Sequence, residues 1–465
     1  MSDHDLLDRF SQAILDLDSK KLPAQVQQQT KLLILDSIGC ALTTLDEHEV
    51  TEAVEAIEST GGAPQATVIG SKGKTSVANA TLANGILVRY LDLNDFTLGM
   101  GKSGISIGGH PSDNIPVALA AGEWRKSSGA DVIASIVAGY DVFERLRAVF
   151  DNKGRWDGTT VSGIVAAAMT GRLMNFDVGK MSNAIALAGM RSATPRLVRR
   201  GHITAAKFLA NPLIAQTGVT SAILANGGMT GPRAILDSPD GLRGLFRENA
   251  DFKHLSAPIS EPYAINLAHV KAFPCLATGQ AETAAAIQMH KVLGGRTDHI
   301  ENFEVIMADY EMVHDQQGDQ DRRYPDSREA ADHSFYFLAA VGMMDGTLTM
   351  RSYDNARWTD PVVTALMAKG KMATDAGWNT KAPNGYPCAI KVTLKDGTTH
   401  RTEVAYAPGH SHGSLDETAV VEKFTRLTGG VLSSAEQEKV RDAVLQLEKL
   451  DSIAPVMEMV ADKRK

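Results

Sequence analysis

The chain has 465 residues, of which 43% are hydrophobic and 22% are charged, a composition that excludes an intrinsically disordered chain and can fill more than one core. The formal net charge is -8, which does not favour binding to nucleic acid or to an anionic membrane. An anionic substrate would therefore need a local cluster of Lys and Arg.

The cysteines and the apolar stretches bear on where the protein resides. Cys40, Cys275 and Cys388 lie far apart, so they offer no paired metal-ligand spacing, and their odd number argues against a disulfide framework. No signal-like apolar run follows the acidic first residues, and no apolar stretch reaches the ~18 residues that span a bilayer. We therefore expect buried free thiols in a cytoplasmic protein without a membrane segment.

Helical periodicity dominates the first 260 residues. Leu32, Leu35, Ile38 and Leu42 fit one helical face, and Ala-rich stretches with the same spacing recur after them,. Ala, Gly and Ser dominate the interior positions, which favours closely packed helices. These stretches predict helices over 77–90, 115–123, 132–150, 161–174 and 180–190.

The pattern changes near residue 260, where prolines interrupt the chain. One more Ala-rich helix is predicted over 280–293, and residues 303–307, 389–394 and 400–404 alternate as strands do,. The Asp-Gly pair between the last two strands predicts a hairpin with a type I′ turn, because glycine accepts a positive φ. A charged amphipathic helix is predicted over 434–450.

These elements predict a mainly α protein made of two units. A large, all-helical domain, discontinuous in sequence, is expected from residues 1–264 and 409–465, since the last helix returns to the first unit. Residues 265–408 are expected to form a smaller α+β domain.

A polar cluster around position 100 is the first candidate site. Asp92 and Asp95 lie at the end of a predicted helix, and His110 follows a glycine-rich segment over 98–107. Carboxylates and imidazoles are the side chains that most often transfer protons. A structural role is the alternative, in which the aspartates neutralise a helix end and Ser112 caps the next helix.

Lys207 is a single lysine within a stretch of apolar and small residues. Inside a cleft, burial would lower its pKa, and it would bind a carboxylate or act as a base. Directed outwards, its stem would simply reach the surface. Four arginines shortly before it provide either an anion-attracting field or a solvated basic face, namely Arg191, Arg196, Arg199 and Arg200.

Two loop-to-helix segments in the α+β part carry further polar groups. The first contains Lys271 and Gln280, and the second contains Arg322 and His333. Since Asp332 precedes His333, the alternative role of this histidine is to tie a helix terminus together.

Patterns for a bound metal or cofactor are absent from the sequence. It has no phosphate-binding loop, no Gly-x-Gly-x-x-Gly after a strand and no Gly-x-Ser-x-Gly elbow. His410 and His412 have no third ligand at a convincing spacing. The sequence therefore predicts neither a metal nor a cofactor.

The order of several short motifs resembles the MmgE/PrpD family. Each motif alone is weak, but together they lie in register over nearly the whole chain. They are Leu35-Asp36-Ser37-Ile38-Gly39, Leu91-Asp92-Leu93-Asn94-Asp95, His110-Pro111-Ser112-Asp113-Asn114, Met229-Thr230-Gly231-Pro232, Lys271-Ala272-Phe273-Pro274, Arg328-Glu329-Ala330-Ala331-Asp332-His333-Ser334 and Pro408-Gly409-His410.

The resemblance implies a fold, a chemistry and a set of site residues. The family has a helical domain built from both chain ends, a smaller α+β domain and an active site in the cleft between them, and its members are commonly homodimers. They include 2-methylcitrate dehydratase, cis-aconitate decarboxylase and iminodisuccinate epimerase, which act next to carboxylates without an iron–sulfur cluster. Its active-site positions match Asp92, His110 and Lys207, and Lys271 matches a shared motif.

Some positions point to one branch of the family and others depart from it. Gln280 and the Asp332-His333-Ser334 motif match the dehydratase pattern. However, Gly158 stands where dehydratases carry a histidine after Trp-Asp, and Phe96 stands where a threonine follows the acidic pair. These departures put the dehydratase acid–base set in question.

We therefore predict a cofactor-independent lyase that resembles 2-methylcitrate dehydratase and removes water from a small di- or tricarboxylate. His110 and Asp92 are predicted to transfer protons, and Lys207 to stabilise the carboxylate or enolate or to act as the base. An iminodisuccinate-like epimerase, a cis-aconitate-type decarboxylase and a non-enzymatic binding protein are the alternatives. The further residues predicted to contact the substrate are Lys271, Gln280, Arg322 and Asp95.

Overall fold

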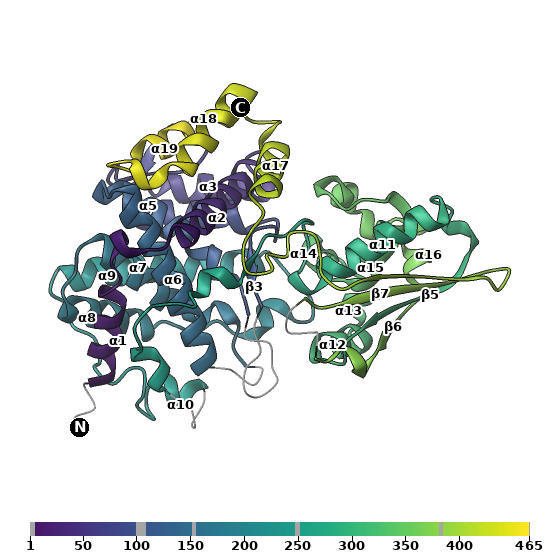
Figure 1. The fold of residues 1–465 in the computed structure, drawn as a ribbon, viewed down its shortest axis with the longest axis horizontal. Helices are drawn as coiled ribbons and strands as arrows, with labels where there is room; N and C mark the ends of the chain where they lie inside the picture. The colour runs from purple at the N-terminus through teal and green to yellow at the C-terminus, as the bar shows by residue number, and fades with distance from the viewer. Residues whose placement is uncertain (1–4, 99–107, 151–154, 247–251, 381–384, 465) are drawn as a thin grey trace.

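A computed structural model describes residues 5–98, 108–150, 155–246, 252–380 and 385–464. Most of the glycine-rich segment over 98–107 therefore lies outside the described residues. The described chain is mainly helical with small sheets, which confirms the predicted fold class. Figure 1 shows a larger helical body beside a smaller part that contains the main sheet.

The helical body is assembled from both ends of the chain (Figure 1). Its N-terminal helices are α1 (Asp5–Leu15), α2 (Ala24–Leu42), α3 (His48–Ser59), α4 (Val77–Arg89), α5 (Ile115–Arg125), α6 (Gly129–Val149), α7 (Ser162–Leu173), α8 (Val178–Gly189), α9 (Ala206–Asn226) and α10 (Leu242–Phe246). The C-terminal helices are α17 (Glu417–Thr428), α18 (Ser434–Leu445) and α19 (Ala454–Met459). These elements share one hydrophobic cluster, which draws on residues 6–270 and 415–460.

The local sequence explains where several helices begin. Ser76 caps α4 by accepting from the N–H of Asn79, and Ser128 caps α6 by accepting from that of Asp131,. Ser433 and Glu436 form a reciprocal capping box at α18,. These caps satisfy N–H groups that have no partner within the helix.

Buried polar contacts join the two chain ends inside this body. α17 packs on α2, and the ammonium of Lys423 lies 2.6 Å from Asp36 and also donates to the carbonyl of Leu93 at 2.8 Å. Both charged side chains are at most 5% exposed. Because removing one partner would strand a buried charge, this pair ties the last helices to the first ones.

Helix α9 has the length and composition of a membrane-spanning helix, but 61% of its apolar window is buried within the protein. It packs against α4, α7 and α8. A helix that is apolar on most sides is also what a protein core requires.

The smaller part is built on a four-stranded sheet. The strands β5 (Ile300–Met307), β6 (Gly370–Thr374), β7 (Cys388–Leu394) and β8 (Thr399–Val404) lie in the order β6-β5-β7-β8, with only the β5–β6 pair parallel. Helix α11 contacts β7 and β8, and α15 packs on α11. The helices of this part are α11 (Gln280–Leu293), α12 (Glu311–Gly318), α13 (Gln320–Arg323), α14 (Arg328–Ala331), α15 (Phe335–Asp345) and α16 (Pro361–Met367).

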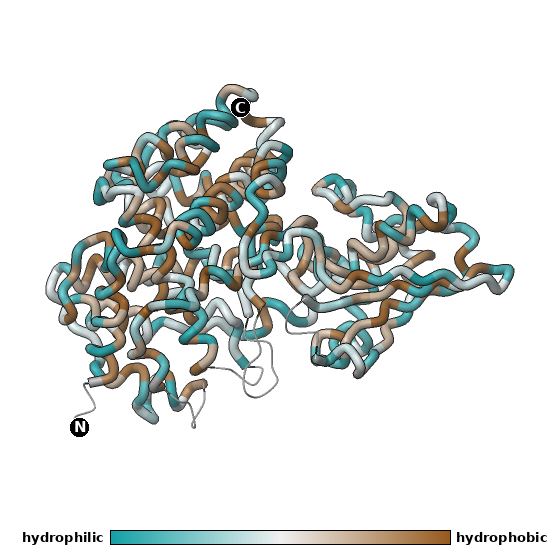
Figure 2. Tube along the Cα trace, in the orientation of Figure 1, coloured by the Kyte–Doolittle hydropathy of each residue, from teal (hydrophilic) through white to brown (hydrophobic). Residues whose placement is uncertain are grey.

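The β7–β8 hairpin is present, but its predicted type I′ turn is wrong. Only Gly397 has a positive φ, +87°, whereas a type I′ turn needs two such residues,. The N–H of Gly397 donates to the carbonyl of Leu394 at 2.9 Å, so Lys395 and Asp396 form a type I turn that Gly397 follows,. Asp396 accepts from the N–H of Thr398 at 2.8 Å, which holds this geometry at the hydrophilic tip in Figure 2.

Short antiparallel pairs complete the fold and link its two parts. The strands β1 (Ala66–Thr67) and β2 (Lys74–Thr75) pair within the helical body. The strands β3 (Phe96–Thr97) and β4 (Ala268–His269) pair with each other, and the side chain of Phe96 packs in the hydrophobic cluster of the α+β part. Residues just after Asp92 and just before Lys271 are thereby held side by side.

Candidate active site

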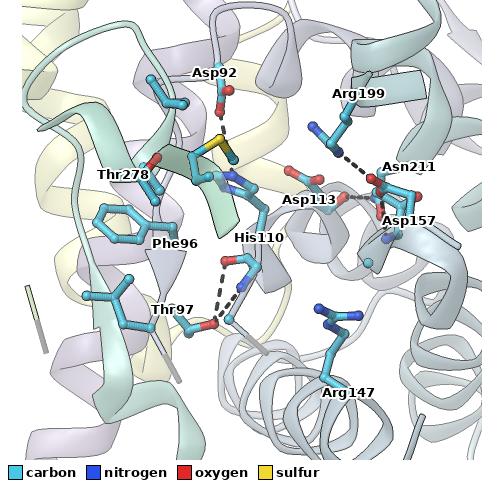
Figure 3. Close-up of a pocket in the computed structure, with 18 of the residues that line it drawn as sticks. Asp92, Phe96, Thr97, His110, Asp113, Arg147, Asp157, Arg199, Asn211 and Thr278 are labelled. Atoms are coloured by element: carbon cyan, nitrogen blue, oxygen red, sulfur yellow. Dashed lines mark hydrogen bonds and ion pairs between the residues drawn. The ribbon is translucent and has the colours of Figure 1, made fainter. Parts of the chain in front are cut away.

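A cavity of about 240 Å³ opens between the helical body and the α+β part. The helical body contributes the turn after α4, the segment around His110, the end of α6 and the 3₁₀ helix Gly158–Val161. The other part contributes the loop before α11, with Met312, His333 and Tyr386. Figure 3 shows this cavity with Asp92 on one side, Arg147 on the opposite side and His110 between them.

The turn after α4 holds Asp92 in a backbone conformation that is rare for a residue with a side chain. Its φ is +49°, and its N–H donates to the carbonyl of Arg89 at 3.1 Å. Such a residue costs on the order of 1–3 kcal/mol and persists only where its surroundings fix it. At Asp92 these surroundings are charged side chains.

Three buried cations contact Asp92. Arg89 and Lys271 both contact Oδ1, Lys271 also donates to the Asp92 carbonyl at 2.8 Å, and Lys207 Nζ lies 3.3 Å from Oδ2. Burial would raise the pKa of Asp92, but Arg89, Lys271 and Lys207 hold it well below its usual range,. Asp92 is therefore ionised at neutral pH and is a weak base. Burial in turn lowers the pKa of Lys271 to about 8.

A second carboxylate, Asp332, joins this cluster between α14 and α15. Lys207 donates to both of its oxygens at 2.7 Å, and Nδ1 of His333 contacts Oδ1. Burial would raise the pKa of Asp332, but Lys207 and His333 bring it down to about 2. Burial and Lys207 also lower the pKa of His333 to about 3, so its imidazole is neutral. With Nδ1 donating to the carboxylate, its lone pair lies on Nε2, 3.8 Å from Asp92 Oδ2,.

His110 is the second imidazole in the cavity. Its Nδ1 lies 2.8 Å from the carbonyl of Asp95, which can only accept, so Nδ1 carries the proton and Nε2 the lone pair,. Nε2 is 3.6 Å from Asp92 Oδ1, and the side chain is 15% exposed. Burial, Arg89 and Lys271 hold the pKa of His110 well below its usual range,. His110 is therefore an unprotonated base at neutral pH.

The wall around Gly158 carries two arginines, Arg147 and Arg199. Arg199 Nε donates to Asp157 Oδ2 at 2.6 Å (Figure 3). Its partner Asp157 also accepts from the N–H of Thr159 and so caps the 3₁₀ helix that begins at Gly158. These contacts fix the position of this wall.

Three of the four arginines noted before Lys207 do not line this cavity. Arg196 and Arg200 lie 3.0 and 2.8 Å from Glu311 on α12, and Arg200 lies 2.8 Å from Asp315. Arg191 is also outside the lining residues. Only Arg199 faces the cavity, while its two paired neighbours bridge the two parts of the molecule.

The residues of this cluster do not suit a metal ion. Asp92, Asp332 and His333 offer ligand atoms within 4.8 Å of one another. However, the ammonium of Lys207 already contacts both carboxylates, at 3.3 and 2.7 Å. A divalent ion would be repelled by Lys207 and by the two further cations on Asp92.

Comparison with protein families identifies the fold. Residues 8–255 match the MmgE/PrpD N-terminal domain, and residues 273–449 match the MmgE/PrpD C-terminal domain. The chain belongs to the MmgE/PrpD family. Both matched segments contribute residues to the lining of the cavity.

Curated relatives of this MmgE/PrpD chain carry two kinds of name. The chain is 28% identical over 466 residues to a cis-aconitate decarboxylase of Mus musculus, which covers 95% of the chain and 90% of that relative. It is 25% identical over 460 residues to the mitochondrial 2-methylcitrate dehydratase of Yarrowia lipolytica, covering 93% and 86%. It is 22% identical over 454 residues to the 2-methylcitrate dehydratase of Salmonella typhimurium, covering 91% and 90%.

The structure gathers some of the sequence-predicted site residues of this MmgE/PrpD chain and separates others. Asp92 and His110 line the cavity, and Lys207 and Lys271 lie buried behind Asp92. His333 also lines the cavity, so its role is not confined to a helix terminus.

Besides Lys271, three further residues predicted to contact substrate lie outside the cavity lining. Gln280 accepts from the N–H groups of Ala272 and Phe273 and donates to the carbonyl of Phe273, so it shapes the loop before α11. Arg322 donates to the carbonyl of Arg199 at 2.6 Å. The side chains of Gln280 and Arg322, which were expected to bind the substrate, therefore bind backbone groups of the protein.

Asp95 is the third displaced residue. Its carboxyl accepts from the hydroxyl of Tyr140 at 2.6 Å, on the side away from the cavity, and only its carbonyl serves the site through His110. Burial raises the pKa of Asp95 to about 8.

No sequence pattern predicted that Arg89, Arg147, Thr278 or Tyr386 would belong to the site. A signal existed for Arg89, the only charged residue in the apolar helix α4, three positions before Asp92. Arg147 and Tyr386 are brought to the cavity by tertiary packing, which local sequence patterns do not predict.

Proposed function

We propose that this MmgE/PrpD protein is a cofactor-independent lyase that removes water from a small di- or tricarboxylate bearing a hydroxyl group β to a carboxylate. The observation that carries the proposal is His110, an uncharged imidazole whose Nε2 is free to accept a proton 3.6 Å from an ionised aspartate. A base of this kind can take a proton α to a carboxylate, and the nearby anion stabilises the imidazolium that forms.

The negative charge of such a substrate would be matched by positive charge on the cavity wall opposite Asp92. Arg147 and Arg199 line that wall, and a guanidinium binds a carboxylate in a fixed, two-pronged geometry,. The cavity of about 240 Å³ suits a molecule the size of a tricarboxylate. Relatives named for 2-methylcitrate and cis-aconitate support the same substrate class.

The proposed reaction moves one proton twice. The α C–H bond breaks, its proton goes to His110 Nε2, and its electron pair forms the enolate of the adjacent carboxylate. The enolate then re-forms a carbonyl and expels the β-hydroxyl, which leaves as water with the proton from the imidazolium. Positioned acids and bases each contribute roughly 10²–10⁴-fold.

The contacts support different roles for two residues from those predicted. With three cations on it, Asp92 stabilises positive charge on His110 rather than removing a proton itself. Lys207, bound to both Asp92 and Asp332, holds these carboxylates in place and sets the local potential.

Epimerisation is a second candidate because two imidazoles line the cavity. His333 has its lone pair on Nε2, as His110 does, so the two offer a pair of uncharged bases. One base would remove the α-proton and the other would return a proton to the opposite face. Decarboxylation is a third candidate, which relatives of that name support.

One experiment separates these reactions. The purified protein is incubated with 2-methylcitrate, citrate, cis-aconitate and iminodisuccinate in D₂O and followed by NMR. We expect a new alkene signal from a hydroxylated substrate. Deuterium at the α-carbon without an alkene would instead establish epimerisation, and loss of CO₂ would establish decarboxylation.

The same assay tests whether the protein is an enzyme at all. His110→Ala and Lys207→Ala should abolish whichever conversion occurs, while an exposed control, Arg351→Gln, should keep the wild-type rate. No conversion of any of the four compounds would contradict the proposed lyase.

A further inference from the structure

The last turn of α6 reaches the cavity wall through Arg147 and Phe143, which both line it. Figure 3 shows the Arg147 side chain extending toward the cavity from the side opposite Asp92. A guanidinium keeps its positive charge at any physiological pH, whatever else it contacts. Arg147 therefore places a permanent charge on the side of the cavity opposite the Asp92 cluster.

Gly158 provides the space that this guanidinium occupies. A Cβ atom added at position 158 would lie 3.3 Å from Cζ, 3.4 Å from Nε and 3.5 Å from one terminal nitrogen of Arg147. A longer side chain would have to pass through the same volume. Gly158 does not have a positive φ, so its backbone does not require glycine. Glycine at this position therefore leaves room for the Arg147 guanidinium.

Two acidic residues influence the charge of this wall. Glu144, one helical turn earlier on α6, contacts Thr97 on the cavity rim, and burial raises its pKa to about 7. Asp157, the acid beside Gly158, is bonded to Arg199 at 2.6 Å. Glu144 is therefore only partly ionised at neutral pH, and Asp157 is shared with a second cation, so the wall keeps an attraction for anions.

We propose that Arg147 determines the substrate specificity of this cavity by binding the carboxylate that lies farthest from His110, and that Gly158 admits it there. This inference rests on the proposed function in one respect, namely that the substrate carries more than one carboxylate. With the reacting carbon beside His110 Nε2, a second carboxylate on the same short molecule extends toward Arg147. A compound without that carboxylate would lack this interaction.

The test combines binding and turnover. Citrate binding to wild type, Arg147→Gln, Arg147→Lys and Gly158→Leu is measured by calorimetry, with Arg351→Gln as the control. For the compound that is turned over, kcat and KM are measured with the free acid and with its terminal mono-amide. Loss of a hydrogen-bonded charge corresponds to about 10- to 100-fold in affinity. We expect that loss in Arg147→Gln, with kcat changed only a few-fold.

Further outcomes separate a binding role from a structural one. Wild type should prefer the acid over the mono-amide, Arg147→Gln should not, and Arg147→Lys should recover part of the preference. Gly158→Leu should reproduce the KM increase with Arg147 still present. Equal citrate affinity in wild type and Arg147→Gln, or an unchanged acid preference, would overturn the inference.

The binding arm distinguishes this inference from the proposed function. If wild type binds citrate, Arg147→Gln does not and none of the candidate substrates is converted, the lyase proposal fails and the role of Arg147 stands. If wild type binds no polycarboxylate, both fail. Thermal unfolding of each variant identifies a folding defect. If the Arg147 variants are misfolded, the citrate affinity and KM of Gly158→Leu test the inference instead, because this variant retains Arg147.

Discussion

Asp92 and Asp95 lie in the same turn, three residues apart, and both are buried, yet their environments are opposite. Asp92 is in contact with Arg89, Lys207 and Lys271, which hold its pKa well below the usual range. Asp95 has only the Tyr140 hydroxyl on one oxygen, and burial raises its pKa to about 8. One carboxyl is therefore an anion at neutral pH, and the other is largely protonated.

The difference shows that the protonation state of a buried carboxyl depends on the side chains that the neighbouring elements place against it. The cations on Asp92 come from α4, from the first turn of α9 and from the segment after β4, so they meet Asp92 only when these distant segments are assembled. Asp95 faces α6 within the helical body alone. Asp92 therefore belongs to the site, whereas Asp95 supports it by fixing His110 through a carbonyl.

The largest effect is expected from Asp92→Asn. The substitution leaves three buried cations without their shared anion, and breaking a buried ion pair in this way costs about 3–5 kcal/mol. It also removes the carboxylate that would stabilise the imidazolium of His110, so kcat should fall by about 10²–10⁴-fold. Urea unfolding and the NMR assay measure the two effects.

Asp95→Asn is the matched comparison for this substitution, since it makes the same chemical change three residues away. Near-equal losses of stability in the two variants at pH 6 would show that the cations do not distinguish the two aspartates. Equal rates in Asp92→Asn and wild type would remove Asp92 from the mechanism.

The next effect concerns His110. His110→Gln should lower kcat/KM by about 10²–10⁴-fold while the protein stays folded, because the base is lost. On the acid side, wild-type kcat/KM should not fall until the pH is below 6.5, since the pKa of His110 is held well below that value and the base is protonated only there. A decline on the acid side centred above pH 6.5 would contradict an uncharged, buried His110.

Much of the fold could be predicted because it follows from periodicity. The helices over 77–89 and 280–293 and the strands at 300–307 and 388–394 repeat apolar residues at the period of their element,. The hairpin turn was missed because Asp-Gly suits both a type I′ turn and a type I turn followed by glycine. The Asp396 contact with Thr398 decides between them, and it exists only in the folded loop.

The candidate site could be predicted only in part. The family motifs indicated Asp92, His110 and Lys207, and these residues lie within one cluster. Gln280 also lies in a motif, but a motif position does not say whether a side chain meets the substrate or the backbone of its own loop. Arg147 lies in no motif and reaches the cavity only because α6 ends beside Gly158.

The smallest effect on activity is expected from Asp95→Asn, which tests the comparison through pH. The folded protein keeps a proton on Asp95 up to a pKa of about 8, whereas the unfolded chain releases it near 3.9,. This group therefore stabilises the fold fully below about pH 4, and its contribution is lost as the pH rises toward 8. Asparagine cannot titrate and resembles the protonated acid. At pH 5, Asp95→Asn should therefore unfold at nearly the same urea concentration as wild type. At pH 8 it should unfold at a higher urea concentration than wild type. A difference that is the same at both pH values would mean that Asp95 is ionised in the folded protein, as Asp92 is, and that the contrast between the two aspartates does not hold.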